Sequence, residues 1–180
     1  AGSTLVEKCC HFFDLMNVIV RQRPLRVYAS GAADVKHRDD RYCRVRPDIL
    51  DNAFAVVDFE GGARALLDLC MFAENSTNEM EIAATGDRGK VEAFVPAHRL
   101  VVTRRDRNEP ATITFPVDAN LAQAGAHHGS TFFEHVAFRD AIRSGGKPVV
   151  SASDGALAVA MGLAGERSAR LGRPVDLAEL

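Results

Sequence analysis

The sequence predicts an α+β fold in which a mostly antiparallel open sheet carries helices packed on one face. Three observations indicate this class: a helical pattern at the start, a long middle region of short apolar runs separated by turn residues, and two helical patterns at the end. Strands that follow one another through tight turns pair antiparallel. The face of the sheet that the helices leave uncovered must then meet another surface, often that of a second subunit.

The first element is a predicted helix over residues 4–20. Thr4 is placed as its N-cap, and Glu7 three positions later completes the pattern of a capping box. The apolar side chains expected to pack this helix against the sheet are Phe12, Leu15 and Ile19.

The middle of the chain predicts about seven short strands. The segment 24–31 has strand propensity, and the charged stretch 34–48 is expected to be a loop. Hairpins are predicted at Glu60-Gly61-Gly62 and at Gly86-Asp87-Arg88-Gly89, because apolar runs flank glycine-rich turns there. Two further strands are expected in the segments "HRLVVTRRD" (98–106) and "ATITFPV" (111–117).

Two helices are predicted to close the chain. The first, "STFFEHVAFRDAIRSGG" (130–146), has Thr131 and Glu134 in capping-box relation and ends in glycines. The second, within residues 153–174, ends at Gly172 and Pro174. Its predicted packing stripe consists of Leu157, Met161, Ala164, Ser168 and Leu171.

Composition narrows the functional classes. The 180 residues carry a net charge of −2, and no aromatic residues are interleaved with the basic clusters, which argues against a nucleic-acid binder. No apolar run approaches the ~20 residues that cross a bilayer, and the chain does not open on a secretory signal pattern. The sequence therefore predicts a cytoplasmic protein that has neither nucleic acid nor membrane as a partner, with its four cysteines as free thiols.

The stretch "EKCCHFFD" (7–14) is the first candidate site. At about 100° per residue, Glu7, His11 and Asp14 share one face of a regular helix. A carboxylate beside an imidazole orients the ring and raises its basicity, which makes a proton-transfer unit near neutral pH. Two alternatives stay open: Glu7 is only a helix cap with two solvated neighbours, or the cluster binds a metal, although its spacing matches no closed zinc pattern.

A second candidate lies in "AHHGSTFFEH". His127 and His128 precede the start of a helix, where free backbone N–H groups and imidazoles favour a polar or anionic ligand. The alternative interpretation is a loop before a helix, with Gly129 as a turn residue.

Four segments, taken in order, resemble the C-terminal substrate-binding domain of the Gfo/Idh/MocA family of NAD(P)-dependent oxidoreductases, which act on sugars, inositols and related polyols. These segments are "GSTLVEKCCHFFDLMN", "DNAFAVVDFEGGARALLDL", "EMEIAATGDRGKVE" and the C-terminal "FRDAIRSGGKPVVSASDGALAVAMGLAGERSARLGRPVDL". The resemblance implies a fold like the C-terminal domain of glyceraldehyde-3-phosphate dehydrogenase.

The resemblance also implies a role for each matching position. His11 stands in the place of the catalytic general base for the substrate hydroxyl, and Asp14 in the place of an acid that holds a substrate hydroxyl. Glu7 stands where the family usually has Asp, so a longer side chain is expected to steady His11. His127 and His128 are expected in the substrate cleft.

The expected organisation is a single substrate-binding and oligomerisation domain over residues 1–180, without the Rossmann domain and its Lys that precede it in the family. NAD or NADP is expected to bind mainly to that missing domain, and the 180 residues alone are predicted to be inactive and free of metal. Relatives imply a homodimer or tetramer through the open sheet face. Two alternatives remain: a non-catalytic binding or dimerisation module, and a family member that uses NAD for another reaction such as glycoside cleavage.

Overall fold

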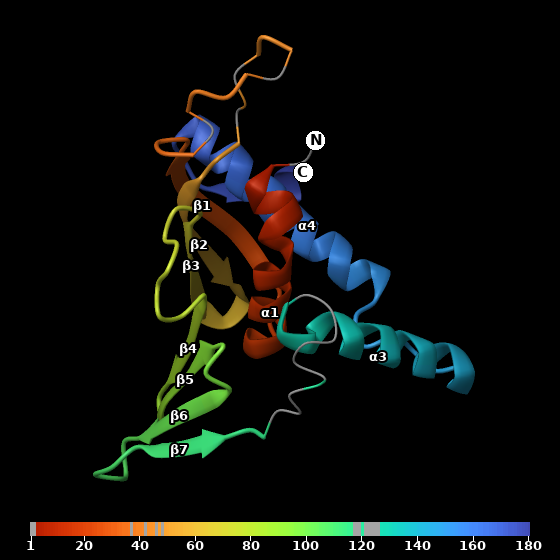
Figure 1. The fold of residues 1–180 in the computed structure, drawn as a ribbon. Coiled ribbons are helices and arrows are strands. Elements are labelled where there is room, and N and C mark those ends of the chain that lie inside the picture. The colour runs from red at the N-terminus through yellow and green to blue at the C-terminus, as the bar shows by residue number, and fades with distance from the viewer. Residues whose placement is uncertain are drawn as a thin grey trace. The chain divides into compact units, whose positions relative to one another are not determined.

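The computed structural model describes residues 3–36, 38–41, 43–45, 47, 49–116, 120 and 127–180. The chain forms two compact units, Ala1–Glu74 with Val150–Leu180, and Asn75–Val149 (Figure 1). Each unit contains one four-stranded sheet whose neighbouring strands are antiparallel. The predicted α+β class with antiparallel open sheets is confirmed, and the strands divide between two sheets.

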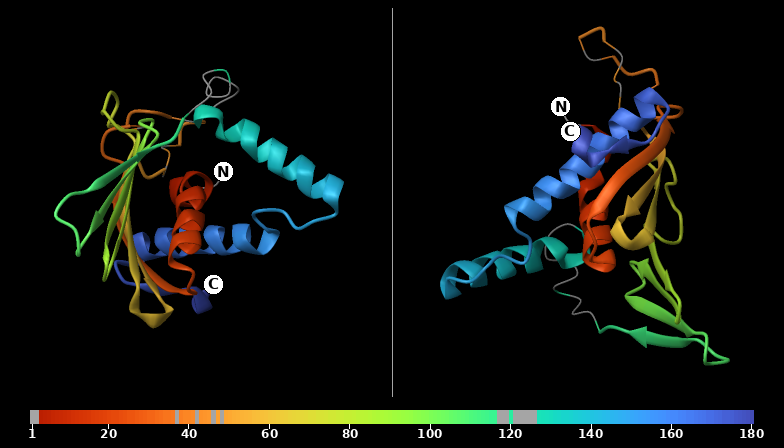
Figure 2. Two further views of the ribbon diagram at one scale, coloured as in Figure 1. Left: turned by 90° about the horizontal axis from the view of Figure 1, so that it is seen from below. Right: turned by 180° about the vertical axis from the view of Figure 1, so that it is seen from behind.

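The first unit is a sheet covered by helices on one face. Its strands lie in the order β3-β2-β1-β8, and Figure 2 shows α1 and α4 on the same side of that sheet. Its elements are η1 (Thr4–Lys8), α1 (Cys10–Val20), β1 (Pro24–Ala32), β2 (Asn52–Phe59), η2 (Glu60–Gly62), β3 (Arg64–Cys70), α4 (Ala152–Leu171), β8 (Val175–Asp176) and η4 (Leu177–Glu179).

The core of the first unit follows from the alternation of its strands. Successive side chains of a strand point to opposite faces, and in β2 the residues Ala53, Ala55 and Val57 are buried while Phe54 and Val56 between them are exposed. The buried side chains of all three long strands join one cluster with side chains of η1, α1 and α4. Coverage on one face is therefore confirmed for this sheet.

The second unit is a meander with strand order β4-β5-β6-β7, followed by α3. The predicted turn between β4 and β5 is confirmed, since the two strands are joined by Asp87 and Arg88. The elements of this unit are β4 (Met80–Gly86), β5 (Gly89–Val95), β6 (Arg99–Arg104), β7 (Ala111–Thr114), η3 (His127–Gly129) and α3 (Ser130–Ser144).

No helix in the described part of the chain is long and apolar enough to cross a bilayer.

The first helical segment differs from the prediction. Thr4–Lys8 is one turn of π-helix, closed by the Cys9 N–H donating to the Thr4 carbonyl at 3.0 Å, and α1 begins only at Cys10. The predicted capping box is wrong, because the Thr4 hydroxyl donates to the carbonyl of Leu50 at 2.6 Å. Thr4 is therefore anchored to the segment before β2 and does not cap the helix.

Two other helix starts also differ. The N-cap of α3 is Gly129, which has no side chain to cap with, so the predicted Thr131–Glu134 box is wrong. The capping box instead occurs at α4, where the Ser151 hydroxyl accepts from the Asp154 N–H, and the Asp154 carboxylate accepts from the Ser151 N–H.

Helix α4 approaches η1 closely through two glycines. A Cβ at Gly162 would lie 2.6 Å from the Leu5 carbonyl oxygen, and one at Gly165 would lie 3.1 Å from Leu5 Cδ1. Of the predicted stripe, Met161, Ala164 and Ser168 are buried, whereas Leu171 is half exposed at the end of the helix. The predicted stripe omits the residues that approach η1 most closely. These are the glycines at 162 and 165, and hydrophobic periodicity does not identify glycines.

Buried Ser168 connects α4 to the sheet. Its hydroxyl oxygen accepts from the Ala29 N–H at 2.8 Å, and its O–H donates to the Arg173 carbonyl at 2.6 Å. Both hydrogen-bonding capacities of a fully buried group are thus used, so its burial leaves no unpaired polar atom.

Asp51 organises the loop that leads from β1 to β2. The fully buried carboxylate accepts hydrogen bonds from the N–H groups of Asp34, Val35 and Lys36 at 2.6 to 3.0 Å, and from the Asn52 amide at 2.9 Å. Burial by itself raises the pKa of Asp51, but these hydrogen bonds more than offset it and lower the pKa to about 2.

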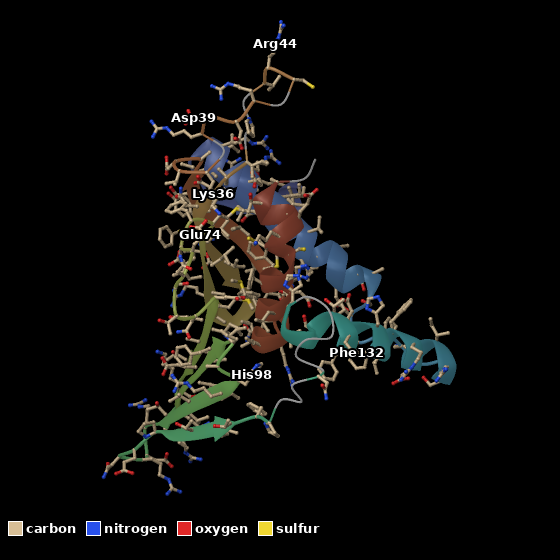
Figure 3. The ribbon with its side chains drawn as sticks, viewed as in Figure 1. Lys36, Asp39, Arg44, Glu74, His98 and Phe132 are labelled. Atoms are coloured by element: carbon tan, nitrogen blue, oxygen red, sulfur yellow. The ribbon has the colours of Figure 1, made fainter. Side chains whose placement is uncertain are left out.

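The same loop is connected to the segment after β3. Lys36 Nζ lies 2.5 Å from Glu74 Oε1 (Figure 3), and the Met71 N–H donates to the Asp51 carbonyl at 2.8 Å. These bonds connect the loop, the start of β2 and the end of β3 around one buried carboxylate.

The close contact at Gly162 predicts that glycine-to-alanine substitutions at two positions of α4 have opposite effects on stability. Gly162→Ala should lower the free energy of unfolding by about 1–3 kcal/mol, because the added methyl group meets a backbone oxygen that must move away. The matched control Gly155→Ala should raise it by roughly 0.5–1 kcal/mol, since the space around Gly155 is open and alanine favours a helix. Urea unfolding of both variants measures the difference, and equal effects at the two sites would contradict the close approach.

The Asp51 network predicts a pH-dependent loss of stability. Asp51→Asn should destabilise the fold by about 3 kcal/mol at pH 7, because an amide NH₂ would face N–H donors. The folded pKa of about 2 lies below the ordinary value of 3.8. The contribution of the ionised Asp51 carboxylate to the free energy of unfolding is therefore present above about pH 4, and it is lost as the pH falls through about 2.

The gap in unfolding free energy between wild type and Asp51→Asn should accordingly narrow between about pH 4 and pH 2, since the variant side chain does not titrate. Urea titrations at a series of pH values measure it. A gap that stays constant over this range would show that the ionised carboxylate does not hold the loop.

Candidate functional site

The candidate site begins with two outward-facing residues of the N-terminal helical segment, Glu7 and His11. Leu5, Cys9 and Phe13 are fully buried, whereas Glu7 and His11 are exposed. The inward side chains recur every four residues and join the core of the first unit. The core therefore fixes the rotation of this segment and presents the imidazole of His11 to the surface.

His11 and Asp14 lie together on α1. They are three residues apart on a regular helix, so they are neighbours on one face. His11 is exposed and Asp14 is half-buried. A neutral imidazole beside a carboxylate can accept a proton from a hydroxyl group, while the carboxylate accepts a hydrogen bond from another hydroxyl.

Glu7 occupies a different local structure from the other two residues. It belongs to the π-helical turn, and its N–H donates to the Ser3 carbonyl at 2.8 Å. Its own carbonyl accepts from the Cys10 thiol at 3.4 Å. The regular spacing of 100° per residue therefore does not determine the direction of Glu7 relative to His11, and its role stays a prediction.

The packing side of α1 is shifted by one residue from the predicted one. Phe13 is fully buried, Phe12 packs partly against the core, and Ile19 is 45% exposed. The π turn inserts one extra residue before α1, which moves the inward face from Phe12 to Phe13. The prediction that Ile19 packs is wrong for this reason.

The two other predicted site histidines belong to the second unit. His127 is exposed and has a φ of 59° within η3. His128 is part of the same turn, and its side chain lies outside the described residues. They therefore come from a different compact unit than Glu7, His11 and Asp14.

Burial makes Cys9 an unreactive neighbour of the site. Desolvation raises the pKa of the Cys9 thiol to about 11, against the opposing effect of Lys8 and with further increases from Cys10 and Glu166. A thiol is nucleophilic only as the thiolate, so Cys9 acts as a core side chain. No group of three or more His, Cys, Asp or Glu within the described residues is arranged to hold a metal ion.

A surface depression of about 420 Å³ lies at one end of the first sheet, away from the predicted residues. It contains the ion pair between Arg26 Nε and Asp58 Oδ2, which are 2.7 Å apart. Sequence analysis did not identify it, because pairing of Arg26 with Asp58 depends on the register of two strands. Its lining residues are Leu25, Arg26, Asp58, Phe59, Gly62, Ala63, Arg64 and Asp176.

A family model supplies the first comparison with known proteins. Residues 1–177 match the model described as "Oxidoreductase family, C-terminal alpha/beta domain" of the Gfo/Idh/MocA group. A search of curated proteins finds no match.

Solved structures share the fold over nearly the whole chain. An oxidoreductase domain protein from Kribbella flavida has a TM-score of 0.80 at 22% identity and covers 98% of this chain and 51% of its own. Levoglucosan dehydrogenase, solved with NADH and levoglucosan, has a TM-score of 0.79 at 22% identity, and the match covers 98% of this chain and 51% of that protein. An oxidoreductase from Agrobacterium radiobacter, solved with NAD+, L-tartaric acid and magnesium, has a TM-score of 0.75 at 18% identity, and the match covers 98% of this chain and 52% of that protein. The chain thus spans about half the length of these proteins.

The burial of Cys9 next to the site helix predicts that it reacts more slowly than the exposed thiols of the chain. Cys43 and Cys70 are exposed and should be alkylated rapidly at pH 8, whereas Cys9 should react only after unfolding. Peptide mapping by mass spectrometry after brief iodoacetamide treatment distinguishes the four thiols. Rapid labelling of Cys9 in the folded chain would mean that the helix is rotated and that His11 does not face outward.

Proposed function

We propose that this chain, which belongs to the Gfo/Idh/MocA family as its C-terminal alpha/beta domain, is the substrate-binding part of an NAD(P)-dependent dehydrogenase. Its substrate in this proposal is a sugar, an inositol or a related polyol. Residues 1–180 act together as that part of a longer protein, because the chain spans about half of the solved proteins that share its fold.

One observation carries the proposal: His11 and Asp14 are presented by a helix that the core holds in a fixed rotation. A proton-transfer group must be placed within hydrogen-bonding reach of the reacting hydroxyl. Buried Cys9 and Phe13 supply that placement from the opposite side of the helix. The π turn before it is also a feature that occurs often at functional sites.

Each residue has a separate role in this proposal. His11 accepts the proton of the substrate hydroxyl as the carbinol is oxidised, and the hydride would pass to NAD or NADP held by another part of the longer protein. Asp14 accepts a hydrogen bond from a neighbouring hydroxyl. Glu7 steadies His11, and His127 and His128 contribute to the substrate cleft. The role of this chain is thus to position the substrate and to receive a proton.

The described residues do not fit a dinucleotide. A dinucleotide site is built on parallel strands joined by a helix whose first turn holds the pyrophosphate, whereas every strand pair in the described residues is antiparallel. The proposal therefore places NAD or NADP on another part of the longer protein. The 180 residues alone should be inactive.

The ligands of similar structures support the substrate class. Levoglucosan dehydrogenase was solved with NADH and levoglucosan, and the Agrobacterium radiobacter protein with NAD+, L-tartaric acid and magnesium. Levoglucosan and tartaric acid each carry more than one hydroxyl group, and an imidazole and a carboxylate are groups to which a hydroxyl donates.

The open face of the first sheet supports self-association. Tyr28, Phe54 and Leu66 are 44%, 56% and 60% exposed on the face opposite the helices. Exposed apolar patches of this kind mark interaction sites, and we place a second copy of the chain there, in a homodimer or tetramer. The cytoplasmic location stays a prediction from the sequence.

His11→Asn in the full-length protein should lower the turnover of a polyol substrate by about 10²-fold or more, because proton transfer loses its acceptor. Cofactor affinity should stay nearly unchanged, since the cofactor binds elsewhere. Steady-state kinetics with NAD and NADP over a panel of polyols, together with cofactor titration, measure both quantities.

The control is His135→Asn, which removes an exposed imidazole from α3 and should leave turnover intact. Near-normal turnover in the His11 variant would contradict the proton-transfer role. Full activity of the full-length protein after changing both Glu7 and His11 would favour the alternative in which this chain is a non-catalytic binding or dimerisation module of that protein.

A further inference from the structure

Lys8 adds a positive charge to the outward face of the N-terminal helical segment. Its side chain is exposed, whereas that of Cys9, the next residue, is fully buried. Within the described residues, Lys8 forms neither an ion pair nor a side-chain hydrogen bond. A lysine ammonium has three N–H donors, so this group is available to a ligand at the candidate site.

The direction of Lys8 relative to His11 follows from the backbone between them. The π turn ends at Lys8, and Cys9 has helical torsions, with φ of −86° and ψ of −6°. The Cys9 carbonyl accepts the regular α-helical hydrogen bond from the Phe13 N–H at 3.0 Å. Lys8 and His11 are three residues apart across this helical stretch, so they are neighbours on one face.

Lys8 and Asp14 lie on opposite sides of His11. At 100° per residue, each of the two lies about 60° from His11, in opposite directions around the helix. Along the helix axis, each lies about 4.5 Å from His11. The outward face therefore carries a cation, an imidazole and a carboxylate in that order.

Glu7 limits how much negative charge a ligand can bring to Lys8. Consecutive residues of a helix do not face each other, so Glu7 does not neutralise Lys8 by pairing with it. The exposed Glu7 carboxylate still adds negative charge nearby. A carboxylate with one negative charge fits this surrounding better than a phosphate, which carries about −1.5 to −2 at neutral pH.

This inference rests on the proposed function and narrows its substrate class. We propose that the substrate is a sugar acid, a polyol with a carboxylate at one end, and that Lys8 binds this carboxylate. Asp14 accepts a hydrogen bond from a hydroxyl further along the carbon chain, and the hydroxyl between these two contacts lies opposite His11. Lys8 is thus a specificity residue of the site.

The two contacts also fix the direction in which the substrate lies along the helix. The 4.5 Å between successive groups corresponds to about three carbon–carbon bonds of ~1.5 Å each. A sugar acid therefore presents a hydroxyl from the middle of its chain to His11. A neutral polyol has no anionic group for Lys8, so its direction is not fixed and its reacting hydroxyl is less well positioned.

Matched pairs of substrates test the proposal in the full-length protein. D-gluconate differs from D-glucitol, and D-glucuronate from D-glucose, by a carboxylate in place of a CH₂OH group. With at least one acid, the wild type should have a kcat/KM about tenfold or more above that of its neutral counterpart, because charge-assisted hydrogen bonds are stronger than neutral ones.

Substitution of Lys8 should remove this preference. Lys8→Gln should raise the KM of the acid about tenfold or more with kcat within about threefold, since the contact is the same in the ground state and the transition state. Kinetics with the neutral counterpart and the KM of NAD(P) should not change. Lys8→Arg should retain the preference, because arginine also binds carboxylates.

Lys147→Gln is the matched control, since it removes another exposed lysine, from the segment after α3; it should leave all of these constants unchanged. Circular dichroism checks that each variant is folded.

The outcomes separate this inference from the proposed function. No turnover of these compounds or of the polyol panel would overturn both. Turnover of neutral polyols without a preference for the acid, or an unchanged KM of the acid in Lys8→Gln, would overturn the role of Lys8 alone. A change only in the KM of NAD(P) would assign Lys8 to the cofactor, and a higher kcat/KM for D-glucose 6-phosphate than for D-glucuronate would assign it to a phosphate; either result would overturn the sugar acid.

Discussion

The architecture of the first unit depends on the close contact between the backbone at Leu5 and the glycines of α4. A methyl group at Gly162 would lie 2.6 Å from the Leu5 carbonyl oxygen, so only glycine permits this approach without displacement. Leu5 then fills the core together with Cys9 and Phe13. The same contact fixes the rotation of α1, which decides that His11 faces outward.

Local chemistry made the hairpins predictable from the sequence. Gly61 and Gly62 adopt φ values of 76° and 88°, a region in which glycine is favoured, and apolar runs flank them. The π turn was not predictable in the same way. It depends on the Thr4 hydroxyl reaching the Leu50 carbonyl and on Leu5 meeting Gly162, and both partners are remote in the sequence.

The candidate site, too, could be predicted from the sequence only in part. The spacing of His11 and Asp14 within a regular helix was enough to place them on one face. The direction of Glu7 depends on the turn geometry that precedes α1, so arithmetic from helical periodicity does not reach it. The Asp51 network was missed because a single carboxylate in a charged loop has no sequence pattern that distinguishes a buried, four-bonded anion from a solvated one.

The central claim is that the outward face of α1 contacts the reacting hydroxyl of a polyol. A crystal structure of the full-length protein with NAD(P) and a bound sugar or inositol tests it most directly. The account predicts a substrate hydroxyl within about 3 Å of a ring nitrogen of His11 and a second hydroxyl bonded to Asp14. A substrate bound elsewhere, with His11 in bulk water, would contradict it.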